Sequence, residues 1–185
     1  MDEALRELER ALAGGDEGAR VRLVAALLRA GRVEDAWKRA RASAELAEVA
    51  GRIFEAAGAP FTLSVLVWPL EHPKPESPVR LLGVRNGERP RASIGRAWNR
   101  DLRLRHPDVA KGCCGVRYEG GMSFRLLDSR SKNGTWMRGG PIEEAELGDG
   151  DVFSPATPEI EVELTLGWKG EPWPSVPLPA LEALL

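Results

Sequence analysis

The sequence predicts an α+β protein in which an N-terminal helical hairpin precedes an antiparallel β-sandwich. Apolar residues recur three and four positions apart up to about residue 57, as on one face of a helix. After Pro60 the pattern changes to many short β-rich segments separated by turn residues. With 43% hydrophobic and 29% charged residues over 185 positions, the chain can bury a core. We expect a helical region over 1–58, a sandwich over 59–170 and a proline-rich tail over 171–185.

Three helices are expected in the helical region, over about 2–13, 17–30 and 33–57. Glycines separate them, and Asp16 has the residue type and the position of an N-cap for the second helix. That helix should present one apolar face, formed by Val21, Val24, Ala25 and Leu28. In the tail, residues 178–185 have the spacing of a short amphipathic helix that could dock on the chain or bind a partner.

Residues 23–46 resemble one tetratricopeptide-type hairpin. The matching features are Ala25, Leu28, the Gly31-Arg32 turn, the Glu34-Asp35 cap and Ala36. Residues 16–49 span 34 positions, which is the period of that family. We find one such unit, whereas stacked repeats usually need about three for stability. The simpler interpretation is a hairpin that packs on the following domain or on a second copy, and a homodimer through this region stays open.

The sandwich is expected from closely spaced strand candidates with no helical spacing between them. These candidates cover residues 61–68, 79–85, 91–97, 101–105, 113–119, 123–129, 135–139, 151–154 and 159–168. Asn86-Gly87 is a strong hairpin signal between two of them. The acidic residues Glu143, Glu144 and Glu146 are expected in an exposed loop.

The loop residues of the sandwich follow one another in a specific order. Ile94-Gly95-Arg96 is followed by Asp101, Asp108-Val109, Leu127-Asp128, Ser131 to Thr135, Gly139-Gly140 and Leu147 to Val152. This succession resembles the forkhead-associated (FHA) domain. The resemblance covers residues 79–166, and also 61–68 if that strand opens the sandwich. It implies a sandwich of about eleven strands whose apical loops bind phosphothreonine peptides.

The resemblance also implies particular binding residues. Arg96 would reach the phosphate or the peptide backbone, because a planar guanidinium suits a doubly charged phosphate. A salt bridge from Arg96 to Asp101 or Asp128 is the alternative. Asn133 would hold the peptide main chain, as its counterpart does in the family, and Trp98 in the same apical region is a further candidate peptide contact.

The sequence departs from the family pattern at three of these positions. Ala110 and Cys113 stand where the family has the serine and the histidine of its Ser-x-x-His loop, and Lys132 stands where a threonine is common. Ala110 therefore lacks a hydroxyl for the phosphate, while Lys111, Lys132 and Arg130 add positive charge to the rim. Two interpretations follow: a phosphothreonine reader with an altered pocket, or a degenerate FHA domain that binds an unphosphorylated acidic partner or associates with itself.

Charge and composition weigh against the other function classes. Residues 80–138 carry a net charge of +9, which admits nucleic acid, but no basic stripe with interleaved aromatic residues supports it. Two histidines and two adjacent cysteines, Cys113 and Cys114, suit neither a metal site nor a nucleophile–base pair. We therefore expect a non-catalytic adaptor without a cofactor, metal or membrane span. The free cysteines and the charged N-terminus favour the cytoplasm.

Overall fold

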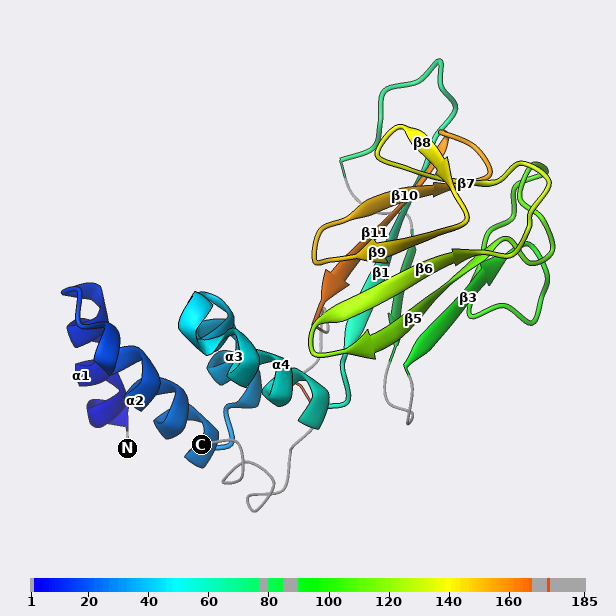
Figure 1. Ribbon diagram of the computed structural model, residues 1–185. Coiled ribbons are helices and arrows are strands. Elements are labelled where there is room, and N and C mark those ends of the chain that lie inside the picture. The colour runs from blue at the N-terminus through cyan, green and yellow to red at the C-terminus, as the bar shows by residue number, and fades with distance from the viewer. Residues whose placement is uncertain (1, 77–79, 85–89, 168–172, 174–185) are drawn as a thin grey trace. The chain divides into compact units, whose positions relative to one another are not determined.

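The computed structural model describes residues 2–76, 80–84, 90–167 and 173. Two compact units are present (Figure 1). The helical unit comprises residues up to Gly58 together with Trp173, and the β-sandwich comprises Ala59 to Lys169, of which Trp168 and Lys169 lie outside the described residues. The expected Asn86-Gly87 turn and the expected tail helix over 178–185 also lie outside the described residues.

The helical unit contains four α-helices and one 3₁₀ turn. They are α1 (Asp2–Ala13), α2 (Glu17–Arg29), α3 (Val33–Arg41), η1 (Ala44–Leu46) and α4 (Ala47–Ala56). Gly15 and Gly31 adopt positive φ angles of 94° and 72° between the first three helices, a conformation that glycine reaches without strain. Asp16 caps α2, since its Oδ1 accepts a hydrogen bond from the Ala19 backbone N–H at 3.2 Å.

Two sequence-based expectations for these helices are wrong. The single helix expected over 33–57 is interrupted after Arg41. Ser43 is extended (φ −128°, ψ 130°), and the 3₁₀ turn η1 begins at the next residue. Val21 was also expected on the apolar face of α2, but its side chain is 52% exposed and lies outside that face. The buried face of α2 is instead formed by Ala19, Leu23, Val24, Leu27 and Leu28.

An aromatic cluster closes the helical unit. The Trp37 ring of α3 stacks on Phe54 of α4 with 5.6 Å between ring centroids. Trp173 lies 4.9 Å from Trp37 and 5.9 Å from Phe54. Trp37 and Trp173 are both buried, so this part of the C-terminal segment belongs to the core of the helical unit.

The β-sandwich contains two sheets with eleven strands among the described residues. In spatial order, the first sheet holds β2 (Arg80–Val84), β1 (Phe61–Val67), β11 (Ile160–Leu166), β10 (Val152–Pro155), β7 (Thr135–Met137) and β8 (Gly140–Ile142). The second sheet holds β4 (Leu102–Arg103), β3 (Arg91–Gly95), β5 (Cys114–Gly120), β6 (Ser123–Asp128) and β9 (Glu144–Leu147). The antiparallel sandwich expected from the sequence is confirmed, with one parallel pair, β3 with β4.

The core lies between the two sheets. Alternate residues of β11 are buried, including Ile160, Val162 and Leu164, as expected for a strand with one face on a core. Phe61 of β1 meets Phe124 of β6 with 4.7 Å between ring centroids, so aromatic side chains join the two sheets. This packing gives the loops at each end of the sandwich a rigid support.

The sequence-based expectation of an acidic loop around Glu144 is wrong. Glu144–Leu147 forms β9, which pairs antiparallel with β6. Leu147 is buried, and the carboxylate of Glu144 accepts a hydrogen bond from Arg125 of β6 at 3.4 Å. The short strand β8 was likewise not expected. β9 forms one edge of the five-stranded sheet, and β8 forms one edge of the six-stranded sheet.

Candidate functional site

Three loops lie at one end of the sandwich. The first follows β3 and covers 96–101, the second joins β4 to β5 over 104–113, and the third joins β6 to β7 over 129–134. Figure 1 shows β3 and β6 ending at the same end at which β5 begins. We call these segments the apical loops, and all the site residues predicted from the sequence lie on them.

Main-chain hydrogen bonds join the first apical loop to the second. The Arg96 N–H donates to the Ala110 carbonyl at 2.9 Å, and the Ala97 N–H donates to the Lys111 carbonyl at 3.1 Å. The Arg100 guanidinium also donates through Nε to the Lys111 carbonyl, at 3.2 Å. The backbone that carries Arg96 is therefore held against the backbone of Ala110 and Lys111.

Gly95 is required by this close approach. A Cβ added at Gly95 would lie 2.5 Å from the Lys111 carbonyl oxygen, which the hydrogen bonds from Ala97 and Arg100 hold in place. We expect Gly95→Ala to destabilise the sandwich by about 1–3 kcal/mol, as overpacking does in cores. Urea unfolding checks this, with Gly140→Ala as a matched control because its added Cβ meets no atom within 4 Å. Equal stability of the two variants would contradict the argument.

Arg96 is exposed, and its guanidinium is oriented by the second loop. Its Nε donates to the Val109 carbonyl at 3.1 Å. Among the described residues no carboxylate pairs with Arg96. The carboxylate of Asp101 bonds Ser93, and that of Asp128 bonds Ser131 and Thr135. The expected alternative of a salt bridge to Asp101 or Asp128 is therefore wrong, and the two terminal nitrogens of Arg96 can meet a ligand.

Asp101 fixes the first loop to β3. Its Oδ2 accepts hydrogen bonds from the Ser93 backbone N–H at 2.8 Å and from the Ser93 hydroxyl at 2.6 Å. Burial raises the pKa of Asp101, but the two bonds from Ser93 outweigh it and the pKa is lowered overall. A lowered pKa contributes stability above the unfolded value of about 4 that is lost as the pH falls through the folded value.

Replacing Asp101 with asparagine tests this pH dependence. We expect Asp101→Asn to lose about 1 kcal/mol at neutral pH, because the asparagine is neutral and cannot form the charge-assisted bonds. The difference from the wild type should shrink as the pH falls below about 4, the unfolded value, and through the lowered folded value. Thermal unfolding followed over that pH range measures it, and a difference independent of pH would contradict the assignment.

Asp128 organises the third loop. Its carboxylate accepts hydrogen bonds from the Ser131 N–H at 2.9 Å, from the Ser131 hydroxyl at 2.8 Å and from the Thr135 hydroxyl at 2.7 Å. The side chain of Thr135 is fully buried. The Asp-x-x-Ser spacing is the sequence signal that could have predicted this role of Asp128.

Asn133 joins the third loop to the second. Its Nδ2 donates to the Asp108 carbonyl at 2.8 Å, and its own carbonyl accepts a hydrogen bond from the Trp136 indole N–H at 3.1 Å. The side chain is exposed. The side-chain amide of Asn133 thus stabilises the contact between the second and third apical loops. Binding of a peptide by Asn133 stays a prediction. The sequence could not reveal the partner, because a backbone carbonyl such as that of Asp108 carries no residue signal.

Cys113 contacts the third apical loop from the end of the second. Its thiol donates to the Ser131 hydroxyl at 3.7 Å, and its carbonyl accepts a hydrogen bond from the Ser129 N–H at 2.8 Å. The hydrogen bond with Cys114 and those with Ser131 and Thr135 lower the pKa of Cys113 to about 7, although burial opposes them. The hydrogen bond with Cys113 and full burial raise the pKa of Cys114 well above its ordinary value. Both cysteines are free thiols in the core.

Cationic and aromatic side chains line the rim of the apical loops. Lys111, Arg130 and Lys132 are exposed, and none forms an ion pair with another described residue. Arg130 adopts a positive φ of 56°, which is uncommon for a residue with a Cβ. Trp98 is 84% exposed. The apical loops therefore present several cations and one large aromatic side chain to solvent.

The described residues hold no group of three or more histidine, cysteine, aspartate or glutamate side chains placed to bind a metal ion. His106 is partly buried, with Nε2 3.4 Å from a carboxylate oxygen of Glu159. Within the same residues, the helices are too short and too polar to cross a membrane.

Comparison with known proteins gives one family match. Residues 92–154 match the family model of the FHA domain, which spans β3 to β10 and all three apical loops. None of the curated proteins matches the chain.

Solved FHA domains resemble the sandwich. The structure described as a structural and functional analysis of phosphothreonine-dependent FHA domain interactions is 25% identical, with 59% of this chain and 98% of that chain covered and a TM-score of 0.46. The FhaA FHA domain complexed with the intracellular domain of Rv3910 is 26% identical, with 56% and 98% covered and a TM-score of 0.44. An FHA domain from Chlamydia trachomatis is 17% identical, with 60% and 100% covered and a TM-score of 0.46.

Proposed function

We propose that this chain, whose β-sandwich is an FHA domain, is a non-catalytic adaptor that binds phosphothreonine peptides through its apical loops. Arg96 binds the phosphate in this proposal, Lys111, Arg130 and Lys132 add positive charge, and Asn133 and Trp98 contact the peptide. The partner is a protein phosphorylated by a Ser/Thr kinase inside the cell. The helical unit supplies a second interaction surface or a homodimer contact.

The orientation of Arg96 is the observation that carries the proposal. A phosphothreonine has close to two negative charges and three acceptor oxygens, which a guanidinium matches with two parallel hydrogen bonds. Arg96 is exposed, its Nε is fixed on the Val109 carbonyl, and no described carboxylate pairs with it. Binding therefore costs little ordering of the side chain and breaks no existing ion pair.

A phosphothreonine peptide library tests the proposal. The full chain is titrated with each peptide and with the same peptide lacking phosphate, and binding is followed by fluorescence anisotropy. We expect binding that requires the phosphate. If no peptide shows phosphate dependence at millimolar concentration, the domain is not a phosphothreonine reader.

Ala110 weakens phosphate binding in this proposal, because it lacks the hydroxyl of the family serine. We expect Ala110→Ser to tighten phosphopeptide binding about tenfold, since one hydrogen bond to a charged group contributes about 1.5 kcal/mol or more. Isothermal titration calorimetry with one phosphopeptide measures the change. Ala44→Ser, in the exposed turn η1 of the helical unit, is the control and should leave affinity unchanged. Unchanged affinity of Ala110→Ser would place the phosphate away from the second apical loop.

The alternative is an unphosphorylated acidic partner. The replacements at Ala110, Cys113 and Lys132 support it, because lysine attracts an anion as a point charge without the geometric selection of a hydroxyl and guanidinium set. Binding of phosphorylated and unphosphorylated acidic peptides with equal affinity would support this alternative over phosphothreonine recognition.

A further inference from the structure

The outer face of the six-stranded sheet carries two adjoining hollows of about 480 Å³ and about 140 Å³, which share Val152 and Glu161. We call them together the outer groove. It lies over β1, β7, β10 and β11, and its lining includes none of the apical-loop residues assigned to phosphopeptide binding. The outer groove therefore has a lining of its own, and it borders the third apical loop where the Trp136 indole N–H donates to the Asn133 carbonyl.

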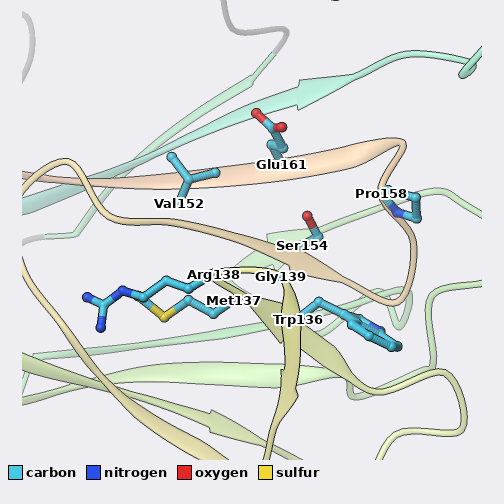
Figure 2. A pocket seen from close by; sticks show the side chains of 8 residues that line it. All are labelled: Trp136, Met137, Arg138, Gly139, Val152, Ser154, Pro158 and Glu161. Atoms are coloured by element: carbon cyan, nitrogen blue, oxygen red, sulfur yellow. The ribbon is translucent and has the colours of Figure 1, made fainter.

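The larger hollow is mainly apolar. Figure 2 shows Trp136 from β7, Val152 from β10 and Pro158 from the following turn around it, with Glu161 on β11 at one side. Trp136 and Val152 are 43% and 40% exposed. Large apolar side chains exposed together on a sheet face are typical of protein-binding surfaces.

The smaller hollow is acidic. Glu76, Glu161 and Glu163 line it, against the single cation Lys74. The Lys74 ammonium forms an ion pair with Glu161 and lies 5.4 Å from the centroid of the Trp68 ring. Lys74 belongs to a proline-rich segment outside the strands, so the acidic hollow already holds one ammonium group.

Ser64 supplies an independent indication of a ligand. It lines the acidic hollow from β1 and is 5% exposed. Its hydroxyl has no hydrogen-bond partner among the described residues. A buried hydroxyl without a partner costs free energy, so a segment that displaced the groups covering this oxygen and bonded to it would recover that cost.

We propose that the outer groove is a second protein-binding site, which takes an unphosphorylated extended segment of a partner protein with one basic and one apolar side chain. The basic side chain enters the acidic hollow in the place of Lys74 and pairs with Glu161 and Glu163. The apolar side chain packs between Trp136 and Val152. The larger hollow is also lined by Arg138, which pairs with Asp151, so the acidic character belongs to the smaller hollow. Because the apical loops are cationic and this smaller hollow is acidic, the apical loops select anionic groups and the smaller hollow selects basic side chains.

Unphosphorylated peptides of defined sequence test this site. Each contains one Lys-Pro step and one leucine or tryptophan, separated by about two to six residues to sample the span of an extended segment at about 3.3 Å per residue. The ¹⁵N-labelled full chain is titrated with them, and amide shifts are mapped. We expect shifts in β1, β7, β10 and β11 that disappear when the peptide lysine is replaced by glutamate.

Substitutions in the outer groove distinguish binding at this site from nonspecific electrostatic binding. Glu161→Gln and Glu163→Gln should each weaken binding about two- to fivefold, and Lys74→Ala should strengthen it by a similar factor by removing the internal competitor. Glu146→Gln, on β9 of the other sheet, makes the same charge change and should have no effect. All four variants should bind phosphothreonine peptides with the same affinity. The outer-groove proposal and the phosphothreonine proposal can therefore fail independently of each other.

Three outcomes would overturn the inference. One is the absence of groove shifts at millimolar peptide, and another is equal binding to Glu161→Gln, Glu163→Gln and Glu146→Gln. The third is the appearance of the same shifts on concentrating the chain without peptide, which would make a second copy the occupant.

Discussion

Replacing Arg96 with alanine is expected to weaken phosphothreonine-peptide binding by at least about a hundredfold and to remove its dependence on phosphate. Two charge-assisted hydrogen bonds are lost, each typically contributing about 1.5–3 kcal/mol when the donor is charged. Lys111, Arg130 and Lys132 remain at the rim, but exposed charges of this kind each contribute little. Titration calorimetry of the variant with phosphorylated and unphosphorylated peptides measures both effects.

Two further variants decide what Arg96 supplies. Arg96→Lys keeps the charge but loses the planar fork and the bond from Nε to the Val109 carbonyl, so an intermediate affinity is expected. Arg29→Ala removes the same charge from the exposed end of α2 in the helical unit and should bind as the wild type does. Equal losses in Arg96→Ala and Arg29→Ala would mean that net charge, and not the guanidinium geometry, governs binding.

The sequence was sufficient to predict the parts of the site that depend on residue type. Gly95 must be small because the Lys111 carbonyl lies against it, which is why the Gly-Arg step is part of the loop pattern, although the expected strand 91–97 extends two residues past the end of β3. The Asn133-Gly134 step predicts a turn, and Gly134 adopts a φ of 73°. Such positions can be predicted because few residues satisfy their geometry.

Other parts of the structure depend on contacts that leave no local pattern. β9 is short and contains two glutamates, and only its pairing with β6 buries Leu147 and places Glu144 beside Arg125. The residues after Arg41 have good helix propensity, yet the helix ends there and Ser43 is extended. At β9 the pairing with β6 overrides the local preference, while nothing in the structure explains the end of the helix at Arg41. The partner of the Asn133 amide is a main-chain carbonyl, which no sequence pattern reports.

Replacing Asp128 with alanine is expected to destabilise the sandwich by about 3 kcal/mol or more. Three hydrogen bonds to its carboxylate are lost, and the fully buried Thr135 hydroxyl is left without this acceptor. The third apical loop, which carries Lys132 and Asn133, should open with it. Urea unfolding measures the stability, and faster amide hydrogen exchange at Ser131 and Gly134 reports the local opening.

Asp151→Ala is the matched control, because Asp151 also closes a turn by accepting the N–H of Gly148 at 2.8 Å. Asp151 lies between β9 and β10, outside the apical loops, so its loss should lower stability without changing the intrinsic affinity of the folded domain for a phosphopeptide. Asp128→Ala should lower both, even at temperatures where the domain stays folded. Asp128→Asn should be intermediate, since one oxygen still accepts from the two hydroxyls while the amide group faces the Ser131 N–H. If Asp128→Ala lost stability but kept full affinity, the third loop would hold its shape without Asp128, and the binding geometry would depend on the first two loops alone.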